Sequence, residues 1–368
     1  VIVIGGGSGL RVSSAAARHG LKTAIIEEGP LGGTCLNRGC IPSKMIIHSA
    51  DVLETIQRAH EFGINAKATG IDFKKIIERA SVMVDSEAQE IEEGINESKN
   101  LTLFKTRARF IGDKTLKVGD TAIKGKKIII AAGTRPSIPA IAGISSTPYI
   151  TSDQALRLKT QPKKLTIVGG GYIGAELAHF FGSLGTKVTI VQRDPLLLPN
   201  TDKEIAKKFT EIFSKKHQVY TGYSTTQLKK KQLSVIATIS TAKGETKDIE
   251  SDQLLIATGR VPNTDILGIS ETKIKVERFG FIDVNEHMET NVSGIWALGD
   301  VAGRFLFKHS ANLEAQVVVK NAIFDKKEKI SYTAMPYAVF TSPQIAGVGE
   351  REQDLVARKA DFITGTSD

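Results

Sequence analysis

The chain opens on VIVIGGGSGL, residues 1–10, and this stretch decides the expected fold. Four β-branched apolar residues in a row are typical of a buried parallel strand, and a glycine-rich turn follows at once. A helix of small residues then leads to a second apolar strand, Thr23–Ile26. This order predicts a βαβ unit whose turn and helix N-terminus hold the phosphates of a dinucleotide.

The glycines of this turn have separate expected roles. Gly5 should make the tight turn, and Gly7 should let the backbone approach a pyrophosphate. Glu27 lies about 20 residues further on, where a carboxylate would meet a ribose 2′-OH. Leu10 occupies the third glycine position, and we expect this departure to loosen the contact between helix and strand.

The same pattern recurs in LTIVGGGYIGAE, residues 165–176, with a second strand at Lys187–Val191. Two copies, each in its own βαβ context, favour two bound dinucleotides over turns that serve packing alone. Gln192 and Arg193 stand where the first unit has Glu27. Because an arginine pairs with a 2′-phosphate, the second site leans slightly towards NADP rather than NAD.

Both cysteines of the chain lie in GGTCLNRGCIPSK, residues 32–44. The run from Ser43 reads as a helix start, and a helix N-terminus stabilises a thiolate and lowers its pKa. A structural disulfide, a zinc site with His48 or His60, and two unrelated thiols are the alternatives. We favour a reversible dithiol/disulfide pair formed by Cys35 and Cys40.

Further elements follow from local pattern. Gly294–Asp300 reads as a buried strand whose final carboxylate suits the hydroxyls of a sugar-like ligand. Lys127–Ala132 reads as an apolar strand that ends in small residues, and residues 253–259 repeat this pattern. We expect each of these strands to bring the chain of its unit back to the nucleotide site. We expect helices at Ser43–His60, Phe73–Glu97 and Ala311–Phe324, and strands at Leu101–Phe110 and Thr115–Val118.

Composition bounds the functional classes. With 41% hydrophobic residues in 368, the chain can form two or three domains. The net charge of +9 suggests an acidic partner, but the lysines are scattered and aromatic residues make up only 6%. No apolar run approaches the roughly 18 residues of a membrane span. We therefore expect a cytoplasmic protein with no metal site and no nucleic-acid or membrane partner; a nucleotide-binding module without enzymatic activity is the rival class.

These motifs together resemble the flavoprotein disulfide reductases with a redox pair near the N-terminus, the family of dihydrolipoamide dehydrogenase and of glutathione, mycothione and mercuric reductases. The resemblance implies an α/β fold with two Rossmann-like dinucleotide-binding domains and an α+β dimerisation domain. It implies an FAD-binding domain at 1–145, an NAD(P)-binding domain at 146–265, a return segment to the FAD domain at 266–330, and the beginning of the interface domain at 331–368.

The resemblance also implies site residues. Cys40 matches the sulfur that meets the flavin and Cys35 the one that exchanges with substrate, while Lys44 and Glu176 match an ion pair beside the flavin. The positions that match FAD contacts are Gly5, Gly7, Ser8, Gly9, Glu27, Glu28, Gly33, Thr34, Lys44, Ala108, Ala132, Gly133, Thr134, Asp300, Leu306 and His309. Those that match NAD(P) contacts are Gly169, Gly171, Tyr172, Ile173, Gly174, Glu176, Gln192, Arg193 and Gly259. Tyr172 could gate the nicotinamide, and His309 fits a structural hydrogen-bonding role.

The implied activity is electron exchange between NAD(P)(H), FAD, the cysteine pair and a dithiol or disulfide. Residues 258–264 look closest to dihydrolipoamide dehydrogenase, whereas Gln192-Arg193 and residues 307–312 look more like mycothione or mercuric reductase. The expected partners are a small disulfide or a lipoyl domain of a 2-oxoacid dehydrogenase complex, and a second subunit. The family completes its site with a C-terminal His-Pro-x-x-x-Glu from that subunit; since the motif does not occur in residues 1–368, we expect a chain that is incomplete at its C-terminus.

Overall fold

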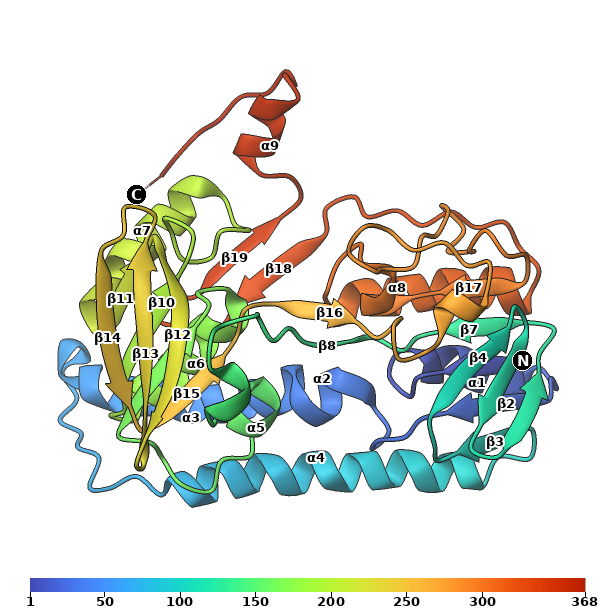
Figure 1. The fold of residues 1–368 in the computed structure, drawn as a ribbon, viewed down its shortest axis with the longest axis horizontal. Helices are drawn as coiled ribbons and strands as arrows, with labels where there is room; N and C mark the ends of the chain where they lie inside the picture. The colour runs from blue at the N-terminus through green and yellow to red at the C-terminus, as the bar shows by residue number, and fades with distance from the viewer. Residues whose placement is uncertain (368) are drawn as a thin grey trace. The chain divides into compact units, whose positions relative to one another are not determined.

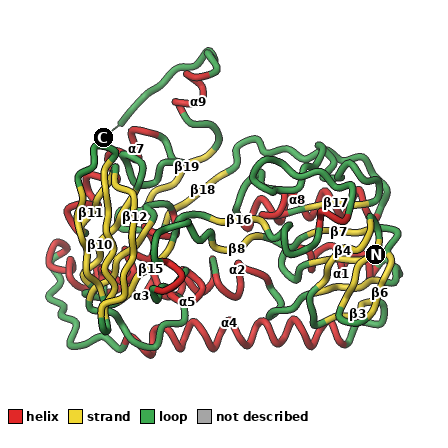
Figure 2. The backbone as a smooth tube through the Cα atoms, viewed as in Figure 1, coloured by secondary structure: helices red, strands yellow, loops and turns green. Residues whose placement is uncertain are grey.

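The computed structural model describes residues 1–367, and these form two compact units (Figures 1 and 2). The first unit consists of Val1–Pro42, Glu78–Pro136 and Arg260–Tyr332. The second consists of Ser43–Ile77, Ser137–Gly259 and the chain from Thr333 on. Each unit is built on its own parallel sheet, so the α/β fold class predicted from the two glycine turns is confirmed.

The first unit has a five-stranded parallel sheet in the order β17-β7-β1-β2-β3. Its central strand β1 is fully buried, as its β-branched sequence predicts. The predicted βαβ unit is present, because β1 pairs in parallel with β2 and α1 connects them. The elements are β1 (Ile2–Ile4), α1 (Gly9–Arg18), β2 (Thr23–Ile26), β3 (Leu101–Phe104), β7 (Ile128–Ile130), β17 (Ile295–Ala297) and α8 (Lys308–Val318).

The predicted strand at Leu101–Phe110 is wrong. Its first part is β3, while its last part begins β4, which belongs to a separate antiparallel sheet. The strand is interrupted between these two parts, where the Thr106 N–H donates to the Phe104 carbonyl at 2.9 Å. The other elements of this unit are α2 (Gly33–Arg38), β4 (Ala108–Gly112), β5 (Thr115–Val118), β6 (Thr121–Lys124), β8 (Thr134–Pro136) and β16 (Arg260–Pro262).

The second unit repeats the design with a parallel sheet in the order β11-β10-β9-β15. As predicted, the strand at Gln253 returns beside the first strand of its unit, just as β7 does in the first unit. The elements are β9 (Lys164–Val168), α6 (Tyr172–Ser183), β10 (Lys187–Gln192), α7 (Lys203–Lys216), β11 (Gln218–Thr221), β12 (Tyr223–Lys231), β13 (Ser234–Thr241), β14 (Thr246–Ser251) and β15 (Gln253–Ile256).

Two long helices, α3 and α4, include residues of the second unit's segment Ser43–Ile77. Helix α3 covers Cys40–Arg58, so it starts three residues before the predicted Ser43, and α4 covers Phe73–Asn96. The predicted helix at Ala311–Phe324 begins earlier, with α8, and ends in a π-helical turn at Val319–Ile323. The remaining elements are α5 (Ser152–Ala155), β18 (Pro336–Val339), β19 (Ile345–Val348) and α9 (Glu352–Ala357), with 3-10 turns at Ala59–Phe62, Ile144–Ser146, Ile269–Glu271 and Gly299–Ala302.

The structure groups Ser43–Ile77 with the second unit, whereas the family resemblance places these residues in the continuous range 1–145. The domain roles assigned to 1–145, 146–265, 266–330 and 331–368 stay predictions. Within residues 1–367, no helix combines the length and apolar character needed to cross a membrane.

Candidate redox and nucleotide sites

Two glycine-rich segments of the first unit form a backbone cradle. Gly5 has φ +107°, and a Cβ there would lie 2.2 Å from the Ala131 carbonyl oxygen. Gly33 has φ +66°, and its Cβ would lie 2.6 Å from the Cα of Gly7. Such approaches exclude any side chain. The cradle therefore exposes main-chain groups to a ligand, as a pyrophosphate requires.

The helix of this βαβ unit stays close to its strand. A Cβ on Gly9 would lie 2.8 Å from Val3 Cγ1, so Gly9 makes the close contact. The loosening expected from Leu10 stays a prediction.

Glu27 is fixed at the end of β2 by two main-chain donors. Its Oε2 accepts from the Gly6 N–H at 2.8 Å, and its Oε1 accepts from the Gly29 N–H at 2.9 Å. The carboxylate thus lies against the glycine turn, where a ribose hydroxyl is expected. Glu28 points elsewhere and pairs with Arg107 at 2.8 Å on the surface.

Asp300 lies in a polar chain with two residues from distant parts of the first unit. Thr134 Oγ1 donates to Asp300 Oδ2 at 2.8 Å and accepts from Arg260 Nε at 2.7 Å. Arg260 Nε also lies 3.9 Å from the same carboxylate oxygen. The chain orients the carboxylate for hydroxyl ligands. Sequence reasoning missed Arg260, although its position directly after Gly259 was a signal.

A buried acid, Glu314, supports the segment that carries Asp300. Its side chain is fully buried, and its two oxygens accept from the Gly299 N–H and, at 2.8 Å, from the Tyr332 hydroxyl. Burial, reinforced by the charge of Asp300, raises the pKa of Glu314 to about 7. Glu314 was not identified from the sequence, because nothing local distinguishes it from a surface glutamate.

The cysteines lie on consecutive helices. Cys35 is the third residue of α2 and Cys40 the first of α3, and both are half-buried free thiols. The hydrogen bond to Cys40, followed by burial, raises the pKa of the Cys35 thiol. The predicted lowering is therefore wrong for Cys35 in this dithiol state, because the shared hydrogen bond and burial outweigh the positive charge of Lys308, which acts in the opposite direction.

Lys308 and Asn37 are further residues that sequence reasoning missed. The Lys308 Nζ donates to Ser8 Oγ at 3.0 Å, which joins α8 to the glycine turn. The buried Asn37 amide donates to the carbonyls of Leu31 at 2.8 Å and Gly33 at 3.0 Å. Asn37 thereby holds the loop that leads into α2, and its place between the cysteines was the available signal.

The other predicted flavin residues are also in the first unit. Thr34 follows Gly33 in α2, and Ala108 begins β4. Ala132 and Gly133 lie between β7 and β8, with Gly133 at φ +64°. Leu306 is exposed, and the His309 ring stacks on Phe307 with centroids 5.2 Å apart. Their contacts with a flavin stay predictions.

The first glycine of the second turn repeats the geometry of Gly5. Gly169 has φ +111°, and a Cβ there would lie 2.3 Å from the Ala257 carbonyl oxygen. A Cβ on Gly174 would lie 2.0 Å from the Gly169 oxygen, whereas nothing lies within 4 Å of a Cβ on Gly171. Gly169 and Gly174 are thus required by the fold, while the space at Gly171 is open to a ligand.

At the end of β10, Gln192 replaces the acid of the first unit. Its Oε1 accepts from the Gly170 N–H at 2.7 Å, and its Nε2 donates to Asp194 Oδ2 at 2.7 Å. Arg193 is exposed and has no hydrogen-bond or ion-pair partner among residues 1–367. At this edge, among residues 1–367, Arg193 is therefore an unpaired cation and the Asp194 carboxylate is bonded to the Gln192 amide.

The remaining predicted nicotinamide residues lie at the start of α6 and after β15. Tyr172 is the first residue of α6, followed by Ile173, and its ring stacks on Tyr337 with centroids 5.9 Å apart. Burial raises the pKa of Tyr172 to about 12, so it stays a neutral phenol. Gly259 has φ +113°, and its carbonyl accepts from the Ser137 N–H at 2.9 Å.

The predicted ion pair of Lys44 and Glu176 is formed within the second unit. The Lys44 Nζ donates to both carboxylate oxygens of Glu176, at 2.9 and 2.7 Å. Glu176 Oε1 also accepts from the Phe340 N–H at 3.0 Å, and Lys44 Nζ lies 4.8 Å from the centre of the Phe340 ring. The pair thus connects α3, α6 and the C-terminal hairpin.

Two dinucleotide cradles and a thiol pair are the elements of a flavin- and nicotinamide-dependent redox protein, and the comparisons with known proteins agree. The family model "Pyridine nucleotide-disulphide oxidoreductase" matches residues 1–322, and the chain belongs to this family. It is therefore an FAD-dependent oxidoreductase that also uses NAD(P) and a redox-active disulfide centre.

Relatives of similar identity carry different names. The chain is 36% identical to mycothione reductase from Mycobacterium tuberculosis, covering 100% of this chain and 81% of the relative. It is 35% identical to dihydrolipoyl dehydrogenase from Chlamydia pneumoniae (98% and 79%) and 34% identical to mercuric reductase from Staphylococcus aureus (99% and 67%). Among solved structures, the HOCl-induced flavoprotein disulfide reductase RclA from Escherichia coli matches with a TM-score of 0.86 and 30% identity, over 98% of this chain and 79% of that one.

Proposed function

We propose that this protein exchanges electrons between NAD(P)(H) and a dithiol/disulfide substrate through Cys40 and Cys35, with dihydrolipoamide as the substrate. One observation carries the proposal: the two thiols are hydrogen-bonded to each other, in the same unit as the first glycine cradle. Paired thiols that share a hydrogen bond are placed to form a disulfide with each other.

The first unit fits FAD. The main chain around Gly5, Gly7 and Gly33 would hold its pyrophosphate, Glu27 a ribose hydroxyl, and Asp300 further hydroxyls. When bound, FAD supplies a centre that takes up a hydride and delivers two electrons. The second unit would hold the nicotinamide dinucleotide at Gly169, Gly171 and Gly174 by the same principle.

The chemistry of the thiols balances without further reagents. Cys35 as thiolate attacks one sulfur of the substrate disulfide, the substrate S–S bond breaks, and one thiol leaves with a proton. Cys40 then attacks the Cys35 sulfur of the mixed disulfide and releases the second thiol. The pair loses the two electrons that the substrate gains, so that NAD(P)H, one proton and a disulfide give NAD(P)⁺ and two thiols. Oxidation of dihydrolipoamide is the reverse sequence.

A small disulfide, of the mycothione or glutathione kind, is the second candidate substrate. The Lys308 charge, which only partly offsets the rise in the Cys35 pKa, supports the glutathione kind, because a cation beside the exchanging sulfur attracts an anionic disulfide. Exposed Arg193 supports NADP as the nicotinamide cofactor, since Asp194 is already engaged by the Gln192 amide. A homodimer, a lipoyl-domain partner and a cytoplasmic location belong to the proposal.

The first test replaces Cys40 by Ser in the protein that carries residues 1–368. We expect the variant to keep bound, yellow FAD and the melting temperature of the wild type, but to lose disulfide reduction by at least about 100-fold, because no second thiol can resolve the mixed disulfide. Cys35→Ser is the matched variant, and it should be unable to attack the substrate disulfide in the first exchange step. Full activity in Cys40→Ser would refute the assignment.

The second readout of the same experiment compares substrates. NADH and NADPH oxidation is measured with lipoamide, glutathione disulfide and Hg²⁺, and NAD⁺ reduction with dihydrolipoamide. The highest kcat/KM with the lipoamide couple supports the proposal, and the highest value with glutathione disulfide supports the second candidate. Absence of turnover by the full-length, FAD-loaded dimer with every acceptor would favour a nucleotide-binding module without enzymatic activity.

A further inference from the structure

We infer that His179 is a buried imidazolium cation and a positioning residue that clamps α3 to α6 and so fixes the Lys44–Glu176 ion pair. All the groups involved belong to the second unit. The charge state of His179 is independent of the proposed function; only the catalytic relevance of the ion pair rests on it.

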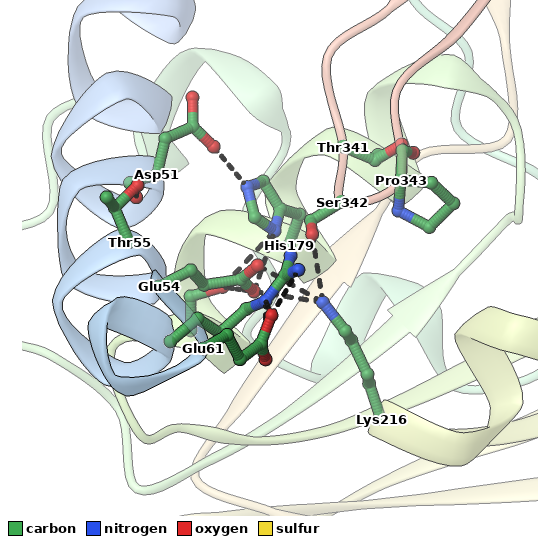
Figure 3. A network of polar contacts seen from close by, with 11 residues as sticks. Asp51, Glu54, Thr55, Glu61, His179, Lys216, Thr341, Ser342 and Pro343 are labelled. Carbon is green, nitrogen blue, oxygen red and sulfur yellow. Dashed lines mark hydrogen bonds and ion pairs between the residues drawn. The ribbon is translucent and has the colours of Figure 1, made fainter. Parts of the chain in front are cut away.

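The His179 side chain is 1% exposed and projects from α6 towards α3 (Figure 3). Its Nε2 lies 2.8 Å from Asp51 Oδ1. Its Nδ1 lies 3.2 Å from Ser183 Oγ and 3.6 Å from Glu54 Oε1. Both ring nitrogens therefore face polar partners inside the protein.

The hydrogen-bond pattern assigns a proton to each ring nitrogen. A carboxylate only accepts, so the nitrogen facing Asp51 must carry a proton. The Ser183 hydroxyl donates its single proton to Glu54 Oε1 at 2.8 Å, so towards Nδ1 it can only accept. Nδ1 must then donate as well. A histidine that donates from both nitrogens is the imidazolium.

Glu54 is ionised, as this pattern requires. Burial, the largest effect, raises the pKa of Glu54, but hydrogen bonds from Ser342, Ser183 and Lys216 help to hold it below its ordinary value. The Lys216 Nζ donates to both oxygens of Glu54, at 3.2 and 3.1 Å, and to Ser342 Oγ at 3.0 Å. Glu54 is thus an acceptor for Ser183 at neutral pH.

The cluster is balanced only when His179 is charged. The charged and titratable groups of this network are Asp51, Glu54 and Arg58 from α3, Glu61 from the turn that follows, Lys216 from the end of α7, and His217. Burial, together with the positive charges of His179 and Lys216, lowers the pKa of His217 to about 4, so His217 is neutral. With His179 charged, three carboxylates (Asp51, Glu54 and Glu61) are matched by three cations (His179, Lys216 and Arg58), and a neutral His179 would leave one carboxylate uncompensated.

The same histidine lies beside the ion pair. Glu176 and His179 are three residues apart on α6, and Lys44 and Asp51 are seven apart on α3, spacings that place each pair on one helix face. The helices are therefore joined in succession by Lys44–Glu176 at 2.7 Å, Asp51–His179 at 2.8 Å and Glu54–Ser183 at 2.8 Å. The middle contact sets the register in which Lys44 meets Glu176.

The charge is tested by nitrogen NMR of the protein with ¹⁵N-labelled histidine at pH 7. We expect the His179 signals of two protonated ring nitrogens, lost in His179→Gln and kept in His48→Gln, a variant of an exposed histidine on α3. A His179 spectrum with one unprotonated nitrogen would overturn the imidazolium.

The positioning role is tested by site-specific lysine acetylation, read by mass spectrometry. In His179→Gln the acetylation rate of Lys44 should rise several-fold, because the ion pair loosens, while that of Lys105, paired with Glu92 in the first unit, stays constant. Adding Asp51→Asn should restore slow Lys44 acetylation, since it removes the uncompensated carboxylate. Unchanged Lys44 reactivity, an equal rise at Lys105, or no rescue by the second substitution would each contradict the proposal.

These readouts need neither flavin turnover nor substrate. If the proposed disulfide reduction fails while both readouts give the expected results, the positioning role of His179 is supported. The catalytic role of the Lys44–Glu176 ion pair is then refuted. If the enzyme reduces disulfides as wild type in His179→Gln, with Lys44 released, then the ion pair is dispensable for the reaction and its catalytic relevance is overturned.

Discussion

At the scale of single residues, the acid at the first nucleotide turn is replaced by an amide at the second. Glu27 and Gln192 each accept from the N–H of the middle glycine of their turn, at 2.8 and 2.7 Å. The second unit therefore has the same hydrogen bond to the glycine N–H but no negative charge at this position. This difference is what a site needs in order to admit a 2′-phosphate, and it is set by one side chain.

Glu314 predicts a pH dependence of stability at the same scale. Its folded-state pKa of about 7 lies above the ordinary value of 4.5, so its contribution is complete below pH 4.5 and is lost as pH rises through 7. We expect the free energy of unfolding to fall by roughly 2 kcal/mol between pH 5 and pH 7, measured by urea unfolding at pH 5, 6 and 7.

Glu314→Gln should flatten that slope, because a glutamine does not titrate. The exposed Glu328→Gln, a variant in the same unit, is the control and should retain the slope. An equal pH dependence in Glu314→Gln and the wild type would show that other groups cause it.

At the scale of elements, the break between α2 and α3 is what brings the thiols together. In one continuous helix, residues five apart point about 140° away from each other around the axis. The chain instead turns at Gly39, where φ is −144° and a Cβ would lie 2.9 Å from the Thr34 carbonyl oxygen. Cys35 and Cys40 can then share a hydrogen bond.

Asn37 holds this arrangement, and Asn37→Ala should loosen it. The substitution leaves the carbonyls of Leu31 and Gly33 without their buried donor, which we expect to cost about 1–3 kcal/mol of unfolding free energy. Iodoacetamide should alkylate Cys35 faster in the variant, as measured by mass spectrometry. Asn200→Ala, on an exposed residue, is the control; identical Cys35 reactivity in both variants would contradict the role of Asn37.

At the scale of the whole molecule, each unit contains one parallel sheet and one glycine turn. The chain thus provides two separate dinucleotide cradles, as the repeat in its sequence predicts. The C-terminal hairpin β18–β19 belongs to the second unit, where Phe340 contacts the Glu176 carboxylate.

This division predicts separate protection by the two nucleotides. FAD at 100 times its Kd should stabilise by about 2.7 kcal/mol and slow hydrogen exchange at Gly5–Gly9, whereas NADP⁺ should slow it at Gly169–Gly174. Exchange is followed by mass spectrometry with each nucleotide alone and with both. Protection of the first turn by NADP⁺ and of the second by FAD would reverse the assignment of the two cradles.

Much of the fold and part of the site were determined by the sequence alone. Strand, glycine turn and helix are local patterns, so both βαβ units, the return strands and the redox pair could be identified from neighbouring residues. The single strand expected at Leu101–Phe110 failed for the complementary reason, since only pairing shows that β3 and β4 enter different sheets.

Only the tertiary structure decided which distant side chains meet. Lys308 reaches Ser8 across 300 residues, His179 reaches Asp51 across 128, and Thr134 meets Asp300 across 166. No local periodicity encodes such contacts, because they depend on how helices and loops pack once each sheet has formed. The direction of the Cys35 pKa shift was decided there as well, by burial and by the neighbouring thiol.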